Sequence, residues 1–319
     1  MAITMNRVLV TGGAGFIGSH LCEHLLRSGR RVMVVDDLDD FYDPQLKRAN
    51  LEAMKSAGDY DFYAVDIRDS SRLEQVFQTA QPNAVIHLAA RAGVRPSLLY
   101  PALYTSVNVD GTLCLLELSR KYEVQRFVFA SSSSVYGQFN RVPFSEDDPT
   151  SKPLSVYAAT KAAGEGLAFT YSHLYQLPII CLRIFTAFGP RQRPDLAIRK
   201  FAQLIQEGKE LPVFGDGSMS RDYTYVTDVV SAIELALECD YPFEIFNVGN
   251  SHPVRLDYMI ETLESAFGKK ARRILLPTAP GDMPVTFASL EKSRRLLGYS
   301  PKVSFEEGMR LFVDWFRGQ

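Results

Sequence analysis

Short apolar runs rich in β-branched and aromatic residues recur along the first half of the chain, separated by segments whose apolar positions repeat with a helical period. The runs cover residues 7–10, 31–35, 84–88, 126–130 and 178–182. Strands that are apolar on both faces and alternate with helices are typical of a parallel sheet covered on each side. The pattern therefore predicts an α/β fold with a doubly wound, Rossmann-like parallel sheet.

The pattern changes after Arg183. Proline, glycine and arginine become frequent, the strand-like runs shorten, and no second glycine-rich phosphate loop follows. Segment 226–247 is apolar enough to return to the main sheet. We therefore expect residues 1–184, together with 226–250, to form a cofactor-binding domain. Residues 185–225 and 251–319 would form a smaller, C-terminal α/β domain that binds the substrate.

Composition and charge exclude several classes of function. Of the 319 residues, 46% are hydrophobic and 23% are charged, and the net charge is -2 with no basic block. This balance argues against nucleic-acid and membrane-surface partners. The four cysteines are far apart and do not have metal-ligand spacing. Because no signal peptide or bilayer-spanning run is visible, the sequence predicts a soluble, cytoplasmic protein.

The first strand runs into a glycine-rich turn, Thr11-Gly12-Gly13-Ala14-Gly15-Phe16-Ile17-Gly18. In such a turn Gly12 permits the tight bend, Gly15 lets the backbone approach a diphosphate, and Gly18 allows close packing of helix against sheet. The helix that starts at Phe16 and Ile17 then offers free N–H groups and its positive dipole end to phosphates. A lone glycine motif is weak evidence, but its place between a strand and a helix predicts dinucleotide binding.

Residues at the ends of the next strands extend this cofactor site. Asp36 ends the second strand, where a carboxylate binds the adenosine ribose hydroxyls and repels a 2′-phosphate, so NAD is favoured over NADP. Acidic residues at strand ends are also common in loops, so Asp36 alone does not indicate a cofactor site. It does so only together with the strand, the glycine turn and the helix that precede it. The other cofactor candidates are Asp66, Ile67, Leu88, Ala89 and Ala90.

A second constellation lies after the fifth strand. Ser131-Ser132-Ser133-Ser134 follows that strand, and Tyr157-Ala158-Ala159-Thr160-Lys161 opens a helix. Residues four apart share one helix face, so the Lys161 ammonium can lie beside the Tyr157 phenol and lower its pKa. Tyr157 then becomes a plausible general base toward a hydroxyl. The alternative is an exposed pair of no catalytic importance, since this spacing arises by chance in many helices.

Together, the glycine turn, the serine cluster, the Tyr-Lys spacing and Asn108 resemble the extended short-chain dehydrogenase/reductase family, over essentially the whole chain. The resemblance implies Ser132 as the catalytic hydroxyl, Tyr157 as acid and base, and Asn108 as a supporting group. Lys161 would tune the tyrosine and, with it, bind the nicotinamide ribose of NAD. Which serine of 131–134 is catalytic stays open.

Several stretches are similar to the UDP-glucuronate 4-epimerase group of this family. They are DLDDFYDPQLKRAN, SVYAATKAAGE, TYSHLYQLP, FGPRQRPDLAIRKF and PGDMPVTFAS, although positions 187–188 and 191–192 depart from the usual loop. The resemblance implies a sugar carboxylate held by Ser133, Ser134 and Thr186, with Arg193 as a longer-range clamp. The dehydratases of this family carry acidic residues at the positions that Ser133 and Ser134 occupy here, so a dehydratase activity is disfavoured. UDP-glucose 4-epimerase, UDP-glucuronate decarboxylase and a non-catalytic NAD-binding sensor remain alternatives.

The smaller domain is expected to hold the UDP part of a UDP-sugar. The resemblance assigns Arg221 to the diphosphate, although an ion pair with Asp222 or Asp228 is the plain alternative. It also implies a homodimer formed by the helices near 100–122 and 157–175. The other nucleotide-contact candidates are Val213, Phe214, Lys200 and Asp282.

Overall fold

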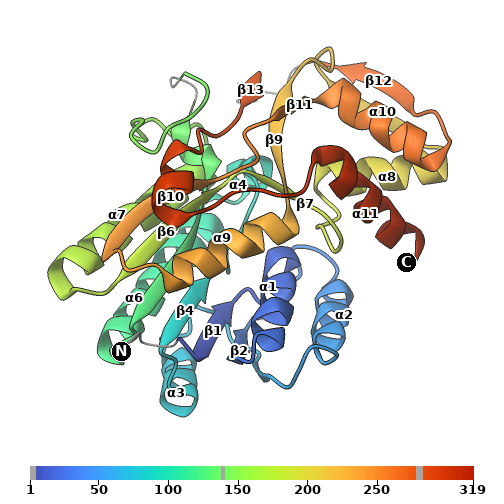
Figure 1. The fold of residues 1–319 in the computed structure, drawn as a ribbon. Helices are drawn as coiled ribbons and strands as arrows, with labels where there is room; N and C mark the ends of the chain where they lie inside the picture. The colour runs from blue at the N-terminus through green and yellow to red at the C-terminus, as the bar shows by residue number, and fades with distance from the viewer. Residues whose placement is uncertain (1–4, 138–140, 278–282) are drawn as a thin grey trace.

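A computed structural model describes residues 5–137, 141–277 and 283–319. Its centre is a seven-stranded parallel sheet with the strand order β10-β6-β5-β4-β1-β2-β3 (Figure 1). The order runs outward from β1 in both directions, as in a doubly wound sheet. The α/β, Rossmann-like fold expected from the apolar runs is confirmed.

The strands of this sheet are β1 (Arg7–Thr11), β2 (Arg31–Val35), β3 (Asp61–Tyr63), β4 (Ala84–His87), β5 (Arg126–Ser132), β6 (Ile179–Ile184) and β10 (Phe243–Val248). The helices between and beside them are α1 (Phe16–Arg27), α2 (Pro44–Met54), α3 (Ser70–Ala80), α4 (Val94–Leu99), α5 (Pro101–Thr105), α6 (Gly111–Lys121), α7 (Val156–Tyr175) and α9 (Val226–Glu238), with the short turns η1 (Ser106–Asp110), η2 (Ser133–Tyr136) and η3 (Ser293–Leu297).

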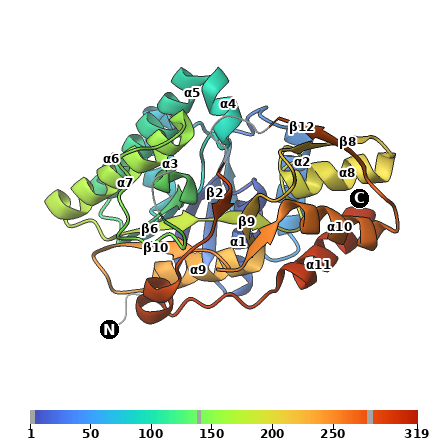
Figure 2. The ribbon, with the colours of Figure 1, turned by 90° about the horizontal axis from the view of Figure 1, so that it is seen from above.

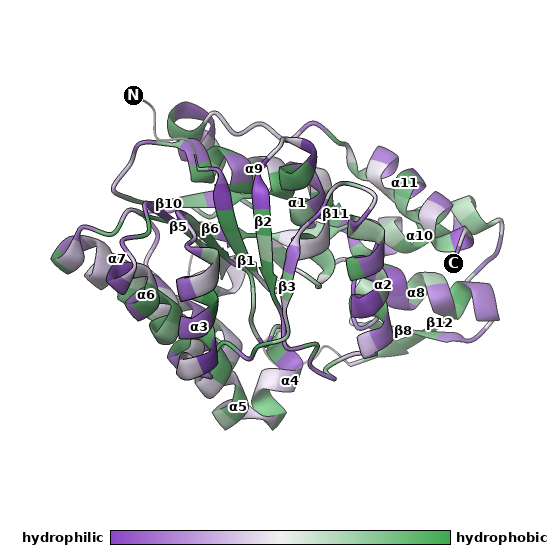
Figure 3. Ribbon diagram, turned by 90° about the horizontal axis from the view of Figure 1, so that it is seen from below, coloured by the Kyte–Doolittle hydropathy of each residue, from purple (hydrophilic) through white to green (hydrophobic). Residues whose placement is uncertain are grey.

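Two hydrophobic clusters lie on the two faces of the sheet. One joins the sheet to α1 and α9, and includes Leu21, Leu25 and Ile233. The other joins it to α3, α6 and α7, and includes Phe77 and Leu115. Figure 3 shows the sheet strands largely in the hydrophobic colour between helices that turn polar positions outward. This explains why the sheet strands read as continuous apolar runs.

A smaller lobe stands beside the sheet, on the side away from α6 and α7 (Figure 2). It comprises β7 (Thr186–Phe188), α8 (Ala197–Glu207), β8 (Glu210–Phe214), β9 (Ser220–Tyr225), β11 (Pro253–Arg255), α10 (Leu256–Phe267), β12 (Arg272–Leu276), β13 (Val285–Thr286) and α11 (Phe305–Arg317). It has its own core, which includes Phe188, Ile205 and Phe312. The exact domain boundaries proposed from the sequence stay a prediction.

Local sequence signals account for the helices that frame the cleft. The Ser155 side chain accepts a hydrogen bond from Ala158 N at the start of α7, and Asp43 accepts one from Gln45 N before Pro44 at the start of α2. Both are preferred N-cap residues. The helix expected near 100–122 is interrupted by a π-turn at Ser106–Asp110. Among the described residues, no helix combines the length and the apolar character needed to cross a membrane.

Candidate active site

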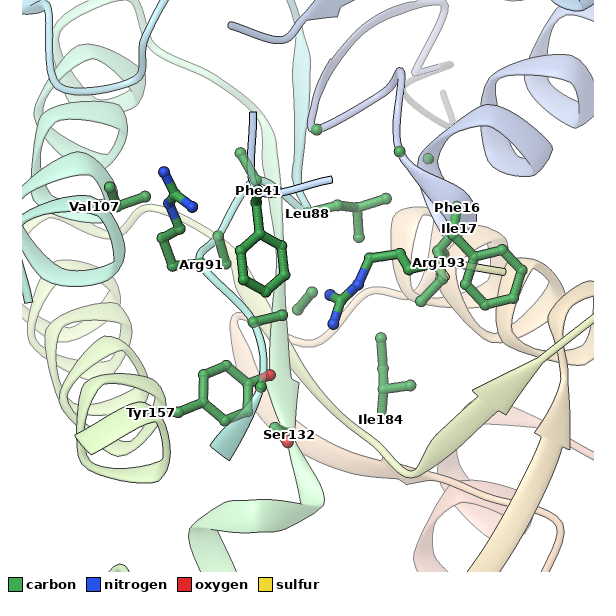
Figure 4. Close-up of a pocket in the computed structure, with 18 of the residues that line it drawn as sticks. Phe16, Ile17, Phe41, Leu88, Arg91, Val107, Ser132, Tyr157, Ile184 and Arg193 are labelled. Atoms are coloured by element: carbon green, nitrogen blue, oxygen red, sulfur yellow. The ribbon is translucent and has the colours of Figure 1, made fainter. Parts of the chain in front are cut away.

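A cavity of about 490 Å³ lies at the carboxyl ends of the sheet strands. Ligands of doubly wound sheets bind at this edge. The glycine turn and the ends of β2 and β4 line one part of it, and the ends of β5 and β6 line another. The start of α7 and the segment that leads into α8 complete the wall. Figure 4 shows the labelled side chains that point into it.

The glycine turn has the shape that a diphosphate requires. Gly12 has φ +71, and a Cβ there would stand 2.7 Å from Ala89 N. A Cβ on Gly18 would stand 2.2 Å from the carbonyl oxygen of Gly12, whereas one on Gly15 would meet only that oxygen, at 3.1 Å, and would otherwise project into open space. No side chain caps the first turn of α1, so its N–H groups stay available. Phe16 and Ile17 also line the cavity. These residues fit the diphosphate of a dinucleotide.

Asp36 lies at the cavity wall with 7% of its surface exposed. Its carboxylate accepts hydrogen bonds from Ala14 N at 3.2 Å and Leu38 N at 2.9 Å, and its Oδ1 lies 3.6 Å from Lys47 Nζ. Burial raises the pKa of Asp36, and Lys47 is the strongest opposing influence. Lys47 also lines the cavity, so a cation stands beside the predicted ribose-binding acid. The sequence reasoning missed Lys47, which is one helix turn into α2.

The remaining cofactor candidates gather at the same edge of the sheet. Arg68 Nε donates hydrogen bonds to both carboxylate oxygens of Asp66, at 3.0 Å each. These bonds lower the pKa of Asp66. It therefore stays ionised while it faces the cavity. The structure places all the other members of this set at the cavity wall as well: Ile67, Leu88, Ala89 and Ala90.

Ser132 and Tyr157 face each other across the cavity floor (Figure 4). A hydrogen bond to Ser132 and the nearby charge of Arg193 lower the pKa of Tyr157, but burial outweighs both and raises it. Ser132 Oγ also accepts a hydrogen bond from Ser134 N at 3.2 Å. The hydroxyl pair thus has the arrangement that proton transfer to or from a sugar hydroxyl needs.

Lys161 lies one helical turn after Tyr157 and is 4% exposed. Its Nζ donates a hydrogen bond to the carbonyl oxygen of Ala130 at 2.7 Å and lies 4.9 Å from the centre of the Phe129 ring. Burial lowers the pKa of Lys161 to about 8. Arg193 is a second cation whose charge lowers the pKa of the Tyr157 phenol. The lowering of that pKa by Lys161 stays a prediction.

Asn108 is buried in the π-turn and does not line the cavity. Its side chain accepts a hydrogen bond from Arg91 N at 2.8 Å and donates to Arg91 O at 2.9 Å and to Thr160 Oγ1 at 3.0 Å. It therefore fixes the loop after β4 to the helix that carries Tyr157. Its supporting role in catalysis stays a prediction.

Four substrate candidates share the cavity with Tyr157: Ser133, Ser134, Thr186 and Arg193. The Arg193 guanidinium is 17% exposed and pairs with Asp195 at 2.8 Å. It also lies 5.3 Å from the centre of the Phe41 ring. Arg193 is thus a largely buried cation that points into the site rather than a solvated surface residue.

The four UDP candidates that the structure describes do not line the cavity. Val213 is buried in the core of the smaller lobe, Lys200 is exposed on α8, and Phe214 lies under the guanidinium of Arg95, 4.3 Å from its centre. Arg221 Nη1 donates to the carbonyl oxygens of Ser220 at 2.9 Å and Met283 at 2.7 Å. Asp282 lies outside the described residues. The UDP assignment of these five residues stays a prediction.

The sequence reasoning also missed Phe41 and Arg91, which both line the cavity. Figure 4 shows the Phe41 ring between the Arg91 and Arg193 side chains. The Arg91 guanidinium lies 5.5 Å from the ring centre and pairs with Asp39. Both residues stand next to predicted ones, since Arg91 follows Ala90 and Phe41 lies in the loop after Asp36. Only the folded loop shows that they face the site.

Comparison with known proteins places this site in a family. A family model described as GDP-mannose 4,6 dehydratase matches residues 9–312. The chain belongs to this family. It is one of the NAD-dependent epimerases and dehydratases among the extended short-chain dehydrogenases/reductases, and the resemblance stated from the motifs is confirmed.

Full-length relatives of this family member include enzymes of known chemistry. A UDP-glucuronate 4-epimerase from Thermodesulfobacterium geofontis is 44% identical over 98% of this chain and 96% of that protein. The crystal structure of UDP-glucuronic acid 4-epimerase from Bacillus cereus, in complex with UDP-glucuronic acid and NAD, superposes on this chain with a TM-score of 0.91. The two sequences are 36% identical, and the match covers 98% of this chain and 99% of the other. A UDP-glucose 4-epimerase from Thermotoga maritima, solved with UDP-glucose, has a TM-score of 0.90 at 35% identity, covering 98% of each chain.

Proposed function

We propose that this protein is an NAD-dependent sugar-nucleotide 4-epimerase that interconverts UDP-glucuronate and UDP-galacturonate. The observation that carries the proposal is one cavity lined by the glycine turn, by Ser132 and Tyr157, and by the hydroxyls and guanidinium suited to a carboxylate. Relatives with this activity span the full length of the chain, which supports the same reaction here.

Tyr157 and Ser132 act on the C4 hydroxyl of the sugar. Ser132 orients the hydroxyl, and Tyr157 removes its proton and later returns it. Lys161, which is buried beside them, supplies the positive charge that stabilises the phenolate. NAD, which the glycine turn and Asp36 would hold, would supply a reversible hydride acceptor for C4. Oxidation at C4 would give a 4-keto sugar, and its reduction on the other face would complete the epimerisation.

The carboxylate at C6 makes the 4-keto sugar a β-keto acid, which loses carbon dioxide when its C5–C6 bond aligns with the carbonyl π system. An epimerase must therefore hold the carboxylate away from that alignment. Ser133, Ser134 and Thr186 can donate hydrogen bonds to it from one wall of the cavity, and Arg193 attracts it from the adjoining segment. A decarboxylase would need the opposite arrangement.

One experiment separates the proposed reaction from its rivals. Purified protein incubated with UDP-glucuronate and analysed by NMR should give UDP-galacturonate. A pentose product would identify a decarboxylase, and turnover of UDP-glucose alone would identify a glucose epimerase. A 4-keto-6-deoxy sugar from UDP-glucose would point to the dehydratase chemistry in the family model's description. If the protein turns over none of these sugars, it is a non-catalytic NAD-binding protein.

The proposal extends to the UDP end, the assembly and the location. The UDP part would contact Lys200, Val213, Phe214, Arg221 and Asp282, as the family resemblance implies. A homodimer is supported by large apolar side chains exposed on α4, α6 and α7 and beside them: Leu98, Leu99, Tyr100, Leu113, Phe169, Leu174 and Tyr175. Such a patch favours association. The four cysteines are free thiols, which supports a cytoplasmic location.

A further inference from the structure

Helix α7 meets the end of β5 through three residues spaced four apart. Tyr157 faces Ser132, and Lys161 Nζ donates to Ala130 O at 2.7 Å. One turn further, Glu165 Oε1 accepts a hydrogen bond from Ser131 Oγ at 2.5 Å. Residues at this spacing lie on one stripe of a helix. The stripe therefore contacts three consecutive residues of the strand that carries the predicted catalytic serine.

Glu165 is anchored from a second strand as well. Arg183, at the end of β6, donates to Glu165 Oε1 through Nε at 3.0 Å and to Oε2 through Nη2 at 2.8 Å. The Arg183 side chain is 4% exposed and the Glu165 side chain is 7% exposed. The same guanidinium donates to Glu146 O at 3.2 Å and lies 4.8 Å from the centre of the Tyr136 ring. Every oxygen of the carboxylate is thus bonded within the protein, away from solvent.

A buried ion pair of this kind is weak evidence for a role in stability, because desolvation offsets most of the attraction between the charges. Its position points to another role. We infer that Glu165 is a positioning residue of the active site: it fixes the Ser131-Ser132 strand end against α7 and supplies the negative charge that balances Lys161. The inference rests on the proposed function of Ser132, Tyr157 and Lys161.

The charges around Lys161 support the second part. Burial lowers the pKa of Lys161, and Glu165 is the group that raises it. His87 on β4 is neutral, because burial lowers its pKa to about 3. Arg183 on β6 is engaged by Glu165 itself, and Tyr157 is neutral at neutral pH because burial raises its pKa. Without the Glu165 charge, Lys161 would face an unbalanced Arg183 and would release its proton at lower pH.

Glu165→Gln tests the inference because it keeps the size of the side chain and removes its charge. We expect the kcat for UDP-glucuronate to fall about ten- to a hundredfold, the loss that a small misplacement of catalytic groups causes. The KM and the bound NAD content should stay within about twofold, and the alkaline limb of the kcat–pH profile should move to lower pH. A wild-type kcat and pH profile would overturn the inference.

Glu264→Gln is the matched control. Glu264 is likewise buried, with 4% of its surface exposed, and it is bonded to an arginine, Arg273, at 3.0 Å, but it lies in the smaller lobe. Equal losses of kcat in both variants, in proportion to lost thermal stability, would mean that Glu165 is merely structural. Should Glu165→Gln fail to fold, Ser131→Ala removes the strand contact while leaving the ion pair. It should lower kcat without changing the pH profile, and an unchanged kcat would again contradict the inference.

A measurement without substrate separates this inference from the proposed function. The ammonium of Lys161 can be titrated by NMR of lysine-labelled protein, as the side-chain signal that is lost in Lys161→Met. Glu165→Gln should move this titration to lower pH, because Glu165 is the group that raises the pKa of Lys161. A shift in a protein that does not turn over UDP-glucuronate would support the positioning role and refute only the function. An unmoved titration would refute the positioning role.

Discussion

Arg191 and Arg193 are separated by one residue, and their guanidinium groups have different partners. Arg191 pairs with Glu23 of α1 at 2.6 Å, and its backbone has φ +62. Arg193 turns into the cavity toward Tyr157 and Phe41. One arginine ties the loop to the sheet region, and the other is placed for an anionic substrate.

Substitution of each arginine by alanine should therefore have different effects. Arg193→Ala should raise the KM for UDP-glucuronate about ten- to a hundredfold through loss of a charge-assisted contact, with little change in Tm. Arg191→Ala should lower Tm, because the largely buried Glu23 then loses its closer arginine and keeps Arg27 at 3.4 Å, and the substitution should change KM little. Steady-state kinetics and thermal unfolding check both. The opposite pairing of effects would contradict the two assignments.

Thr186→Val removes one of the hydroxyls assigned to the carboxylate while keeping the shape of the side chain. We expect slower turnover of UDP-glucuronate and a larger decarboxylated fraction, because a less restrained carboxylate reaches the alignment that releases carbon dioxide. A lost hydrogen bond to a charged group costs roughly 1.5–3 kcal/mol, which is large enough to change the product ratio. NMR of the products measures that ratio. UDP-glucose has no carboxylate and serves as the control substrate. Equal losses on the two sugars would show that Thr186 is structural.

Tyr157→Phe tests the acid and base. The phenyl ring keeps the packing against Tyr104, whose ring centre is 6.4 Å away, but cannot exchange a proton. Turnover should fall on the order of a hundredfold to ten-thousandfold, while the protein still carries NAD. Near-normal turnover would refute the role of Tyr157.

Asp36→Ala tests cofactor choice with Lys47 in mind. The wild-type protein should bind NAD more tightly than NADP, because Asp36 repels the 2′-phosphate. Removal of Asp36 frees the Lys47 ammonium, 3.6 Å away in the wild type, to attract that phosphate, so the preference should narrow. The double variant Asp36→Ala/Lys47→Ala should bind NADP less tightly than the single variant Asp36→Ala, because it lacks the ammonium. Calorimetric titration with both nucleotides measures the effect, and tighter NADP binding by the wild type would rule out this assignment.

Because Lys161 is buried, we expect the protein's free energy of unfolding to rise with pH. Its pKa is about 8 in the folded protein and 10.5 ordinarily, so the unfolded chain holds more protons between these values. The cost of burying the ammonium is present in full below pH 8 and is relieved as pH rises. Lys161→Met should therefore unfold at higher temperature than the wild type at pH 7, by a margin that shrinks toward pH 10.5, and should lack turnover. A lower Tm at pH 7 would contradict the buried-charge cost.

The fold could be predicted from the sequence because its signals are local. The apolar runs give the strands of the main sheet, and glycine spacing gives the turn before α1. The set around Ser132, Tyr157 and Thr186 could be predicted because each of these residues lies in or beside a recognisable motif. They come together at one cavity because the carboxyl ends of parallel strands meet at one edge.

The missed residues depend on contacts between distant segments. Phe41 faces the site only because its loop folds against Arg91 and Arg193, which come from the loop after β4 and from the segment before α8. No spacing in the sequence encodes that contact. The surroundings of Lys161 are hidden from the sequence for the same reason, because its depth of burial and the bond from its Nζ to Ala130 O appear only in the folded chain.

The position of β10 has a consequence for synthesis of the protein. This edge strand, Phe243–Val248, pairs with β6 in the main sheet, although the chain passes through β7, α8, β8 and β9 before it reaches that place. A ribosome must therefore produce the first 248 residues before the sheet can be completed. In a fragment that stops at residue 184, β6 would pair with β5 on one side only. Its other edge, which β10 covers in the full chain, would be open to association with other nascent chains. The cofactor-binding half thus cannot be expected to mature ahead of the rest.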